Sequence, residues 1–412
     1  MKLVDVNMDC LLAIFSYCAE EDLINLCQAN NFLRDVIDFH IFSNLTKDLL
    51  LCGHRNFNSA AVQRNHIGLR YWERLRVARN WMNGTYIECH YFHHKQMFPA
   101  KLYLESKFLY ITYANHLRKY RRSGTEALHH RYDNEITTKT ASDITDFVKK
   151  HNTIFAGRVC GSCFICSDIN GCIDKGEEHK MHQALEYLYC VDFAEKDDLF
   201  VTGSDKCCKL WHRTVELEMS NFELIMKFQH GFKSLKLSND GHWLYGGLYT
   251  DINRRAVRAI NVVSGKDYIL NSNTISVYDL KVKDENVIFT ANFDTTFRMY
   301  DLRLDRDVGI WEDPFDSSLY CLEYDGLYGV LCGAKHHSRV NLYDIRVPGK
   351  YVQLYFPSRT RLHNSSSPVY SLTCDNRYLF VATDHNLRVF DFKVACGIQR
   401  DYSNIYTSTT YK

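Results

Sequence analysis

The spacing of hydrophobic residues changes once along the chain, close to residue 84. Before that point, apolar residues recur every three or four positions, which is the period of an amphipathic α-helix. After it, short runs rich in Tyr, Phe and Val alternate with polar residues, as they do in half-buried β-strands. The pattern predicts a mainly β protein with a small all-α N-terminal domain.

The first segment, residues 1–46, is expected to form three short helices and is called the head below. Its second helix begins at the acidic run Glu20–Asp22, where carboxylates favour the positive end of the helix dipole. Three such helices bury only a marginal core by themselves. We therefore expect the head to pack against the rest of the chain or against another protein. Residues 47–83 are predicted to be a helical spacer, because "ERLRVARNWM" at Glu73–Met82 has helical spacing.

The β region repeats one pattern seven times. Each copy has an apolar strand, a tight polar turn and a second strand that closes on a large apolar residue. The copies span residues 109–120, 154–166, 201–212, 244–261, 288–301, 330–344 and 379–391. A further alternating strand precedes most of them, and a period of roughly 40–45 residues with four strands per unit is typical of WD40 propeller blades. The predicted fold over residues 84–393 is a seven-bladed WD40 β-propeller.

A propeller avoids exposed sheet edges only if its first and last blades meet. The last copy supplies three strands and ends near Phe392. Residues 84–98 alternate Tyr86, Glu88 and His90 with Ile87, Cys89 and Tyr91, so we predict that they close the seventh blade as its fourth strand. Residues 394–412 are polar and aperiodic, and they are predicted to be a C-terminal tail.

Charge and composition narrow the class of protein. The 50 basic and 49 acidic residues give a net charge of +1, which offers no field for nucleic acid. The basic run at residues 116–123 is interpreted as a solvated surface. No apolar run reaches the ~20 residues that a membrane span needs. The 16 cysteines are scattered and no secretory signal precedes them, so we expect free thiols in an intracellular protein, cytoplasmic or nuclear.

No motif for catalysis or for a cofactor is found. The run "CGSCFIC" brings Cys160, Cys163 and Cys166 near Cys172 and His179, which is a spacing that zinc sites use. However, the run falls on a predicted hairpin, where three-residue steps point to opposite faces of a strand. We therefore interpret these residues as structural thiols and predict no metal site. The sequence indicates a binding protein, not an enzyme.

The turns between the second and third strands of several blades carry cations. These residues are Lys206, Arg254, Arg255 and Lys335. Such turns lie on one face of a propeller, where ligands usually bind, so the four cations are candidates for binding an acidic or phosphorylated peptide. Taken singly, each is better explained as a solvated turn residue.

The head resembles an F-box. Its "CLLAIFSYCAEEDLINLCQANNFLRDVI" follows the pattern of that motif, with Val6-Asn7 in place of the usual Leu-Pro and Gln28-Ala29-Asn30 in place of Val-Cys-Arg. Together with the repeats, and with segments such as "LYITYANHLRKY" and "DSSLYCLEYDG", the chain from about Met8 to Phe392 is similar to the F-box/WD-repeat family of ubiquitin-ligase substrate receptors.

This resemblance implies a division of labour. The head would dock a Skp-type adaptor, and through it a cullin/RING ligase core, while the ring would bind a protein substrate for ubiquitination. The residues that the resemblance assigns to the adaptor surface or its supporting core are Leu11, Leu12, Ile14, Phe15, Leu23 and Leu26. The alternative is a WD40 scaffold with a degenerate F-box that assembles a multiprotein complex without ligase function.

Overall fold

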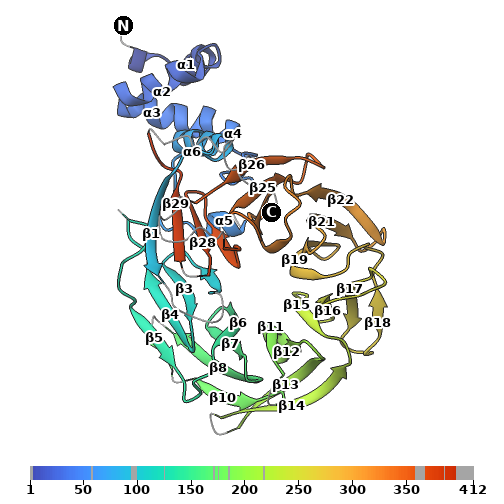
Figure 1. Cartoon of the computed structure of the whole chain (residues 1–412). Helices are drawn as coiled ribbons and strands as arrows, with labels where there is room; N and C mark the ends of the chain where they lie inside the picture. The colour runs from blue at the N-terminus through green and yellow to red at the C-terminus, as the bar shows by residue number, and fades with distance from the viewer. Residues whose placement is uncertain are drawn as a thin grey trace, which may run out of the picture.

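The computed structural model shows a ring of seven β-sheets with a helical head at one edge (Figure 1). The described residues are 3–56, 59–93, 100–124, 126–169, 172–174, 176–183, 186–216, 219–357, 367–384 and 386–395. The predicted tail therefore lies outside the described residues beyond position 395, as does the end of the predicted closing strand beyond position 93.

Short helices build the head and the spacer. They are the 3-10 helix η1 (Leu3–Asp5), α1 (Met8–Ser16), α2 (Glu20–Ala29), α3 (Asn31–Ile37), the π-helix η2 (Asp38–Phe42), α4 (Ser43–Leu45), α5 (Ala60–Gln63) and α6 (Tyr71–Asn83). The 3-10 helix η3 (Glu195–Asp197) lies within the ring. None of the described helices is long and apolar enough to cross a membrane.

The seven sheets are the blades of a propeller, as the repeats predicted. Blade 1 contains β2 (Leu102–Leu104), β3 (Phe108–Tyr113), β4 (His116–Arg121) and β5 (Asn134–Thr137). Blade 2 contains β6 (Ile144–Lys150), β7 (Thr153–Arg158), β8 (Ser162–Ile169) and β10 (Glu177–Lys180), with β9 (Cys172–Ile173) beside β8. Blade 3 contains β11 (Leu188–Ala194), β12 (Leu199–Ser204), β13 (Cys208–Glu216) and β14 (Met219–Phe228).

The remaining blades follow the same antiparallel order. Blade 4 contains β15 (Phe232–Leu237), β16 (Trp243–Leu248), β17 (Val257–Asn261) and β18 (Asp267–Ile269). Blade 5 contains β19 (Val277–Asp284), β20 (Val287–Asn292), β21 (Thr296–Asp301) and β22 (Arg306–Glu312). Blade 6 contains β23 (Leu319–Tyr324), β24 (Gly329–Ala334), β25 (Val340–Asp344) and β26 (Tyr351–Tyr355). Blade 7 contains β27 (Ser371–Cys374), β28 (Tyr378–Ala382), β29 (Asn386–Asp391) and β1 (Ile87–His93).

The last blade is closed by a strand from the start of the ring. β1 pairs antiparallel with β29, so that Ile87 lies opposite Asp391 and His93 opposite Asn386. This is the place that the alternation within residues 84–98 predicted. Gly84, with φ at 66°, ends α6 in a left-handed conformation that a glycine adopts without strain, and it turns the chain into β1.

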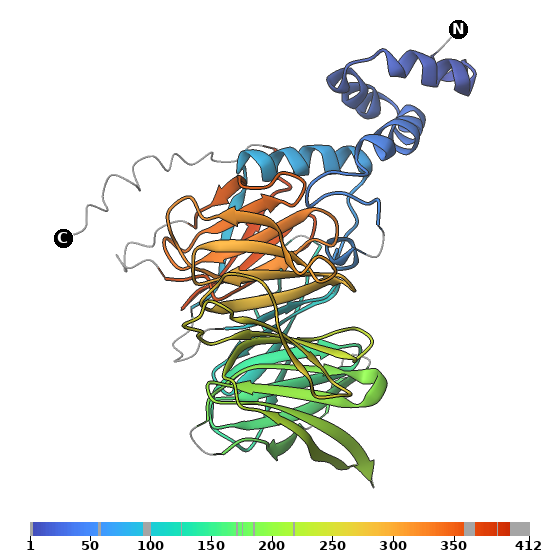
Figure 2. The same ribbon diagram turned by 90° about the vertical axis from the view of Figure 1, so that its right-hand side faces the viewer.

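Helix α6 fixes the head to the ring. Its N-terminal half packs Leu75 into the apolar core of the head. Its C-terminal half buries Trp81, which stacks on Phe392 with ring centroids 3.5 Å apart and donates its indole N–H to the Asn376 carbonyl at 2.9 Å. Figure 2 shows α6 lying along the edge of the ring, with the head projecting beyond it.

The segment around α5 covers one end of the ring. Ala61 N–H donates to the Asp325 carbonyl at 3.0 Å, and Arg64 forms an ion pair with Glu323 at 3.1 Å. Asp325 lies in the turn between β23 and β24, the first two strands of its blade. Helix α5 therefore covers the face of the ring that carries the turns between first and second strands. The turns between the second and third strands lie on the opposite face, which is called the b–c face below.

The basic run at residues 116–123 corrects one prediction. Lys119 is 1% exposed and contacts the Asp168 carboxylate at 2.7 Å. Arg122 is 2% exposed and pairs with the Asp375 carboxylate. The prediction of a solvated surface is therefore wrong for these two cations, which are buried because each has a carboxylate partner brought from another blade.

Candidate functional site

The six head residues assigned to the adaptor surface fall into two groups. Leu11, Phe15 and Leu23 are at most 3% exposed, and they form the core of the head. Ile14 is 43% exposed, whereas Leu12 and Leu26 are half-buried. The structure thus places three of the predicted residues in the core of the head and leaves Ile14 as the most exposed of the six.

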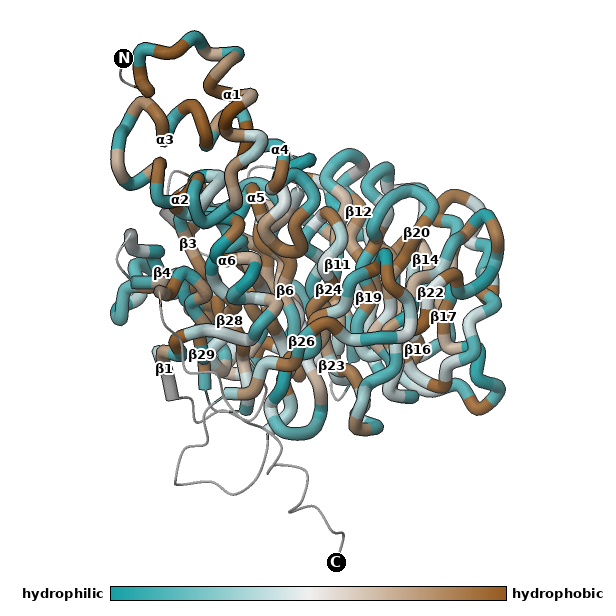
Figure 3. Tube along the Cα trace, turned by 90° about the horizontal axis from the view of Figure 1, so that it is seen from above, coloured by the Kyte–Doolittle hydropathy of each residue, from teal (hydrophilic) through white to brown (hydrophobic). Residues whose placement is uncertain are grey.

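Further apolar side chains of the head face solvent, and sequence reasoning did not assign them to the surface. Tyr17, at the end of α1, is 92% exposed and lies three residues after Ile14, a spacing that puts the two on one side of the helix. Phe32 on α3 is 44% exposed. Hydrophobic segments run along the head where it extends past the ring (Figure 3). Exposed apolar residues concentrated on a small projecting unit are typical of a protein-binding surface.

The two departures from the F-box pattern have structural roles. The Asn7 side chain accepts a hydrogen bond from the Asp9 N–H at 3.0 Å, and so caps α1. The Asn30 side chain accepts from the Phe32 N–H at 2.8 Å and caps α3. Asn is among the best residues for this position, because its side chain satisfies N–H groups that the helix leaves unpaired. The substituted positions therefore still begin helices.

A buried chain of hydrogen bonds links blade 3 to the loop before it. Trp211 Nε1 donates to Thr202 Oγ1 at 3.0 Å, and Thr202 Oγ1 lies 2.8 Å from His182 Nε2. His182 Nδ1 lies 2.8 Å from the Glu186 carboxylate. Burial lowers the pKa of His182 to about 4, so the neutral ring donates from Nδ1 and accepts the threonine hydroxyl at Nε2.

The same place holds the one cluster of potential metal ligands found among the described residues. His182, Glu186 and Cys207 offer ligand atoms that all lie within 4.8 Å of one another. His182 Nδ1 is already used by Glu186 in the hydrogen-bond chain, and burial raises the pKa of the Cys207 thiol. We interpret the cluster as a structural link between blades.

The cysteines of "CGSCFIC" occupy different parts of the molecule. Cys163 packs in the core that β8 shares with blade 3, and Cys166 packs in the core shared with blade 1. Cys160 lies half-buried in the preceding turn, with its thiol 3.1 Å from Ser162 Oγ. The alternation of strand faces that the sequence predicted is present. The Cys172 side chain lies outside the described part of the chain.

The four predicted substrate cations lie in the turns between the second and third strands of blades 3, 4 and 6, on the b–c face. Lys206, Arg254 and Arg255 are exposed, and Lys335 is half-buried. Arg254 donates to Asn273 Oδ1 at 2.7 Å, and Arg255 donates to Asn271. As far as the structure describes the chain, none of the four lines the central pocket.

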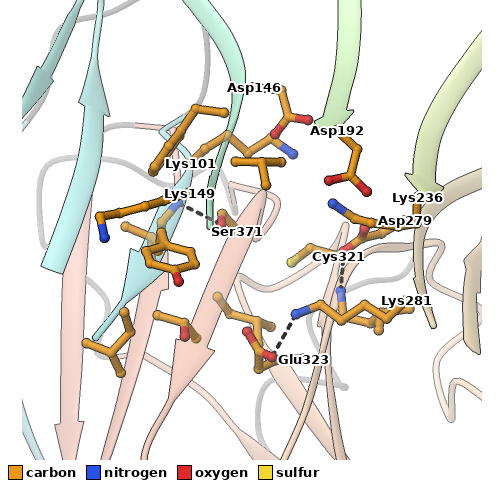
Figure 4. A pocket seen from close by; sticks show the side chains of 18 of the residues that line it. Lys101, Asp146, Lys149, Asp192, Lys236, Asp279, Lys281, Cys321, Glu323 and Ser371 are labelled. Carbon is orange, nitrogen blue, oxygen red and sulfur yellow. Dashed lines mark hydrogen bonds and ion pairs between the residues drawn. The ribbon is translucent and has the colours of Figure 1, made fainter. Parts of the chain in front are cut away.

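The centre of the ring is a charged pocket of about 340 Å³, lined by the first strand of each blade. Figure 4 shows both lysines and carboxylates around it. Lys281 Nζ contacts Glu323 at 2.7 Å, and Lys150 Nζ contacts Asp192 at 2.9 Å. In these two ion pairs, a lysine of the pocket is neutralised by a neighbouring carboxylate.

At the b–c end of this pocket, a β-bulge recurs from blade to blade. The register of β6, β11, β15, β19 and β23 against the next strand shifts by one residue near the start of each. A bulge leaves one residue unpaired and re-aims its side chain. The extra residues are Thr145, Tyr189, Lys233, Tyr278 and Tyr320.

Three of the bulge residues are tyrosines, and they lie beside two further tyrosines in a row of rings with one gap, called the tyrosine arc below. Its members are Tyr189, Tyr249, Tyr278, Tyr320 and Tyr370. Centroid distances are 5.4 Å between Tyr189 and Tyr249, and 4.5 Å between Tyr278 and Tyr320. Tyr370 lies 5.7 Å from Tyr320 and lines the pocket. Sequence reasoning missed the arc, although each bulge residue follows the first buried apolar residue of its strand.

Lys233 spans the gap in the arc. Its ammonium lies 4.3 Å from the ring centroid of Tyr189, 5.2 Å from that of Tyr249 and 5.5 Å from that of Tyr278. Burial lowers the pKa of Lys233 to about 8, and the neighbouring charge of Lys101 adds to the effect. Among the described residues, Lys233 makes no hydrogen bond and no ion pair.

The lowered pKa predicts a pH effect on stability. Between pH 8 and 10.5 the unfolded chain holds the Lys233 proton more tightly than the folded chain does, so raising the pH favours folding. Relative to a Lys233→Met variant, the free energy of unfolding of the wild type should rise by about 1–3 kcal/mol from pH 7 to pH 10. Urea unfolding of both proteins at the two pH values measures this. A constant difference between them would contradict it.

Comparison with known proteins supports the fold and the resemblance. A family model described as "WD domain, G-beta repeat" matches residues 177–212, which include His182, Thr202 and Trp211 of the hydrogen-bond chain. The chain is 24% identical over 358 residues to mouse F-box/WD repeat-containing protein 4, covering 79% of this chain and 78% of the mouse protein. It is 26% identical over 354 residues to the human protein of the same name, covering 78% and 77%.

The resemblance to F-box/WD-repeat proteins is confirmed. It extends over most of the chain, 79% and 78% in the two comparisons. The matched WD repeat begins on β10, the last strand of blade 2, and ends at His212 within β13, the third strand of blade 3, so the repeat unit found by comparison is offset from the blade by one strand.

Proposed function

We propose that this chain is the substrate-recognition subunit of a Skp–cullin–F-box ubiquitin ligase. In this role the head binds a Skp-type adaptor, which holds the cullin/RING core, and the b–c face of the ring binds the protein substrate. The observation that carries the proposal is the exposed apolar surface of a head that also resembles an F-box, a surface that includes Ile14 and Tyr17. The chain itself needs no catalytic group, because it acts by raising the local concentration of substrate lysines.

The rigid attachment of the head supports this role. Tyr355 of blade 6 donates its hydroxyl to the Trp81 carbonyl at 2.7 Å, and Asn80 donates to the Phe392 carbonyl at 2.8 Å. Lys393 adds an ion pair with Glu73 at 2.7 Å. Helix α6 is therefore held by two blades, so a partner on the head is kept at a fixed position relative to a substrate on the ring. A receptor that presents a substrate to an enzyme benefits from such fixed geometry.

The test is a pull-down of the full-length chain with a recombinant Skp-type adaptor. We expect stable binding by the wild type and at least a tenfold loss, about 1.4 kcal/mol, for the Ile14→Asp/Tyr17→Asp variant. Both positions are exposed, so the variant leaves the head core intact. Val263, which is 77% exposed on the ring, provides the matched control: Val263→Asp should bind like the wild type.

Two results would contradict the proposal. If the wild type does not bind the adaptor, the head has another partner, and the alternative of a WD40 scaffold with a degenerate F-box is favoured. If Val263→Asp weakens binding as much as the head variant does, the adaptor does not recognise the head specifically. Circular dichroism of each variant confirms that the propeller is intact.

A further inference from the structure

The tyrosine arc offers an apolar, ring-lined surface with a single unmatched positive charge. The other lysines near the centre of the ring are matched by carboxylates. Burial disfavours the charged form of Lys101, but the carboxylates of Asp146 and Asp279 outweigh it and raise its pKa. The pKa of Lys236 is also raised, because the charges of Asp192 and Asp146 outweigh the effect of burial. Among the described lysines near the centre of the ring, Lys233 is the one that has ring faces around its ammonium instead of a carboxylate.

Two acids border the arc without reaching this lysine. At one end of the arc, burial raises the pKa of Tyr189 and the nearby charge of Asp205 adds to the rise. At the other end, Asp384 forms a hydrogen bond with Tyr370. Neither forms an ion pair with Lys233 in the described structure. A partly buried cation that faces aromatic rings and has no carboxylate partner in the described structure is stabilised by an anion that approaches in a water-poor site. The charge that is missing from this surface is therefore negative.

We propose that the tyrosine arc and Lys233 bind an extended, unphosphorylated segment of a partner protein, which places an Asp or Glu carboxylate on the Lys233 ammonium. Apolar or aromatic residues of the segment lie against the flanking rings of Tyr278 and Tyr320. This inference specifies the class of substrate for the proposed function. It rests on the proposed function only because it takes the partner protein to be the substrate of the ligase.

A carboxylate fits this site better than a phosphoryl group. A phosphoryl group carries close to two negative charges and is usually met by several arginines that bind it bidentately. Here one ammonium is available, and the tyrosine rings around it present their electron-rich faces. Arg254 and Arg255 are the two arginines predicted to bind an acidic or phosphorylated peptide, and they already donate hydrogen bonds to Asn273 and Asn271. A single lysine on aromatic faces matches a single negative charge.

The experiment uses the immobilised full-length chain and synthetic peptide libraries with one fixed central residue and random flanks. The central residue is Glu, Gln, Lys or phosphoserine. We expect the Glu library to be retained at least about tenfold more than the Gln library, and phosphoserine to be retained no better than Glu. Sequencing of the retained Glu peptides should show aromatic or aliphatic residues enriched beside the centre.

Matched variants test whether Lys233 is responsible. Lys233→Met should lose the preference for Glu over Gln, and Lys233→Arg should keep it. Lys266 is the control, because its ammonium also lies over a tyrosine, 4.8 Å from the Tyr268 centroid, but on the outer part of blade 4. Lys266→Met should retain the preference in full. Thermal unfolding of each variant establishes that it is folded.

Three outcomes would overturn the inference. These are equal retention of the Glu and Gln libraries, stronger retention of phosphoserine than of Glu, and an unchanged preference in Lys233→Met. Failure here is distinguishable from failure of the ligase proposal, because adaptor binding is measured on the head with variants that leave the arc unchanged. A chain that binds the adaptor but shows no acidic preference keeps the ligase proposal and loses only this inference.

Discussion

Replacing Trp81 by alanine is expected to lower the free energy of unfolding by about 3–5 kcal/mol. The indole is completely buried, stacks on Phe392 and packs edge-on against Tyr355 with centroids 5.5 Å apart. Its removal leaves a cavity between α6 and blades 6 and 7, and it leaves the Asn376 carbonyl without its indole donor. Urea unfolding followed by circular dichroism measures the change.

Trp243 provides the comparison for this variant. It lies on β16 and is only partly buried, with Tyr268 as its aromatic neighbour at 5.7 Å. Trp243→Ala should cost less than half as much as Trp81→Ala, because its removal opens a site that water already reaches. If the two variants lose the same free energy of unfolding, α6 does not anchor the head to the ring in the way described. The fixed geometry between head and ring would then lose its main support.

The blades were predictable because their signals are local. A strand, a tight turn and a second strand lie within about 15 residues, and alternation identifies each of them without knowledge of distant partners. The closing strand was predictable for a different reason. Once the last copy showed only three strands, a ring without open edges required a fourth, and Ile87–His93 carried the alternating pattern nearest the start of the ring.

The features that sequence reasoning missed depend on distant partners or on a break in alternation. Lys119 and Arg122 look like surface cations, because Asp168 and Asp375, which neutralise them, lie 49 and 253 residues away. Tyr189 and Tyr278 follow a buried residue, and simple alternation makes them ordinary outward-facing positions. Only the register shift of each strand shows that they belong to one surface.

The second large effect is expected for Arg339→Met, which should lower the free energy of unfolding by about 3–5 kcal/mol. Arg339 and Asp313 are both fully buried in an ion pair, and Asn341 Nδ2 donates to the same carboxylate at 2.7 Å. Methionine fills most of the volume but leaves the Asp313 charge without its cation. As a control in the same blade, Arg346→Met removes a partly exposed pair with Asp344 and should cost about 1 kcal/mol or less.

A double variant separates the lost pair from the stranded charge. Asn at position 313 still accepts the backbone N–H groups of Phe315 and Ser317, which now donate to Asp313 at 2.9 and 3.0 Å, but it carries no charge. Arg339→Met/Asp313→Asn should therefore be more stable than Arg339→Met alone. If the double variant is no more stable than the single one, the cost lies in packing around the arginine and not in the uncompensated charge.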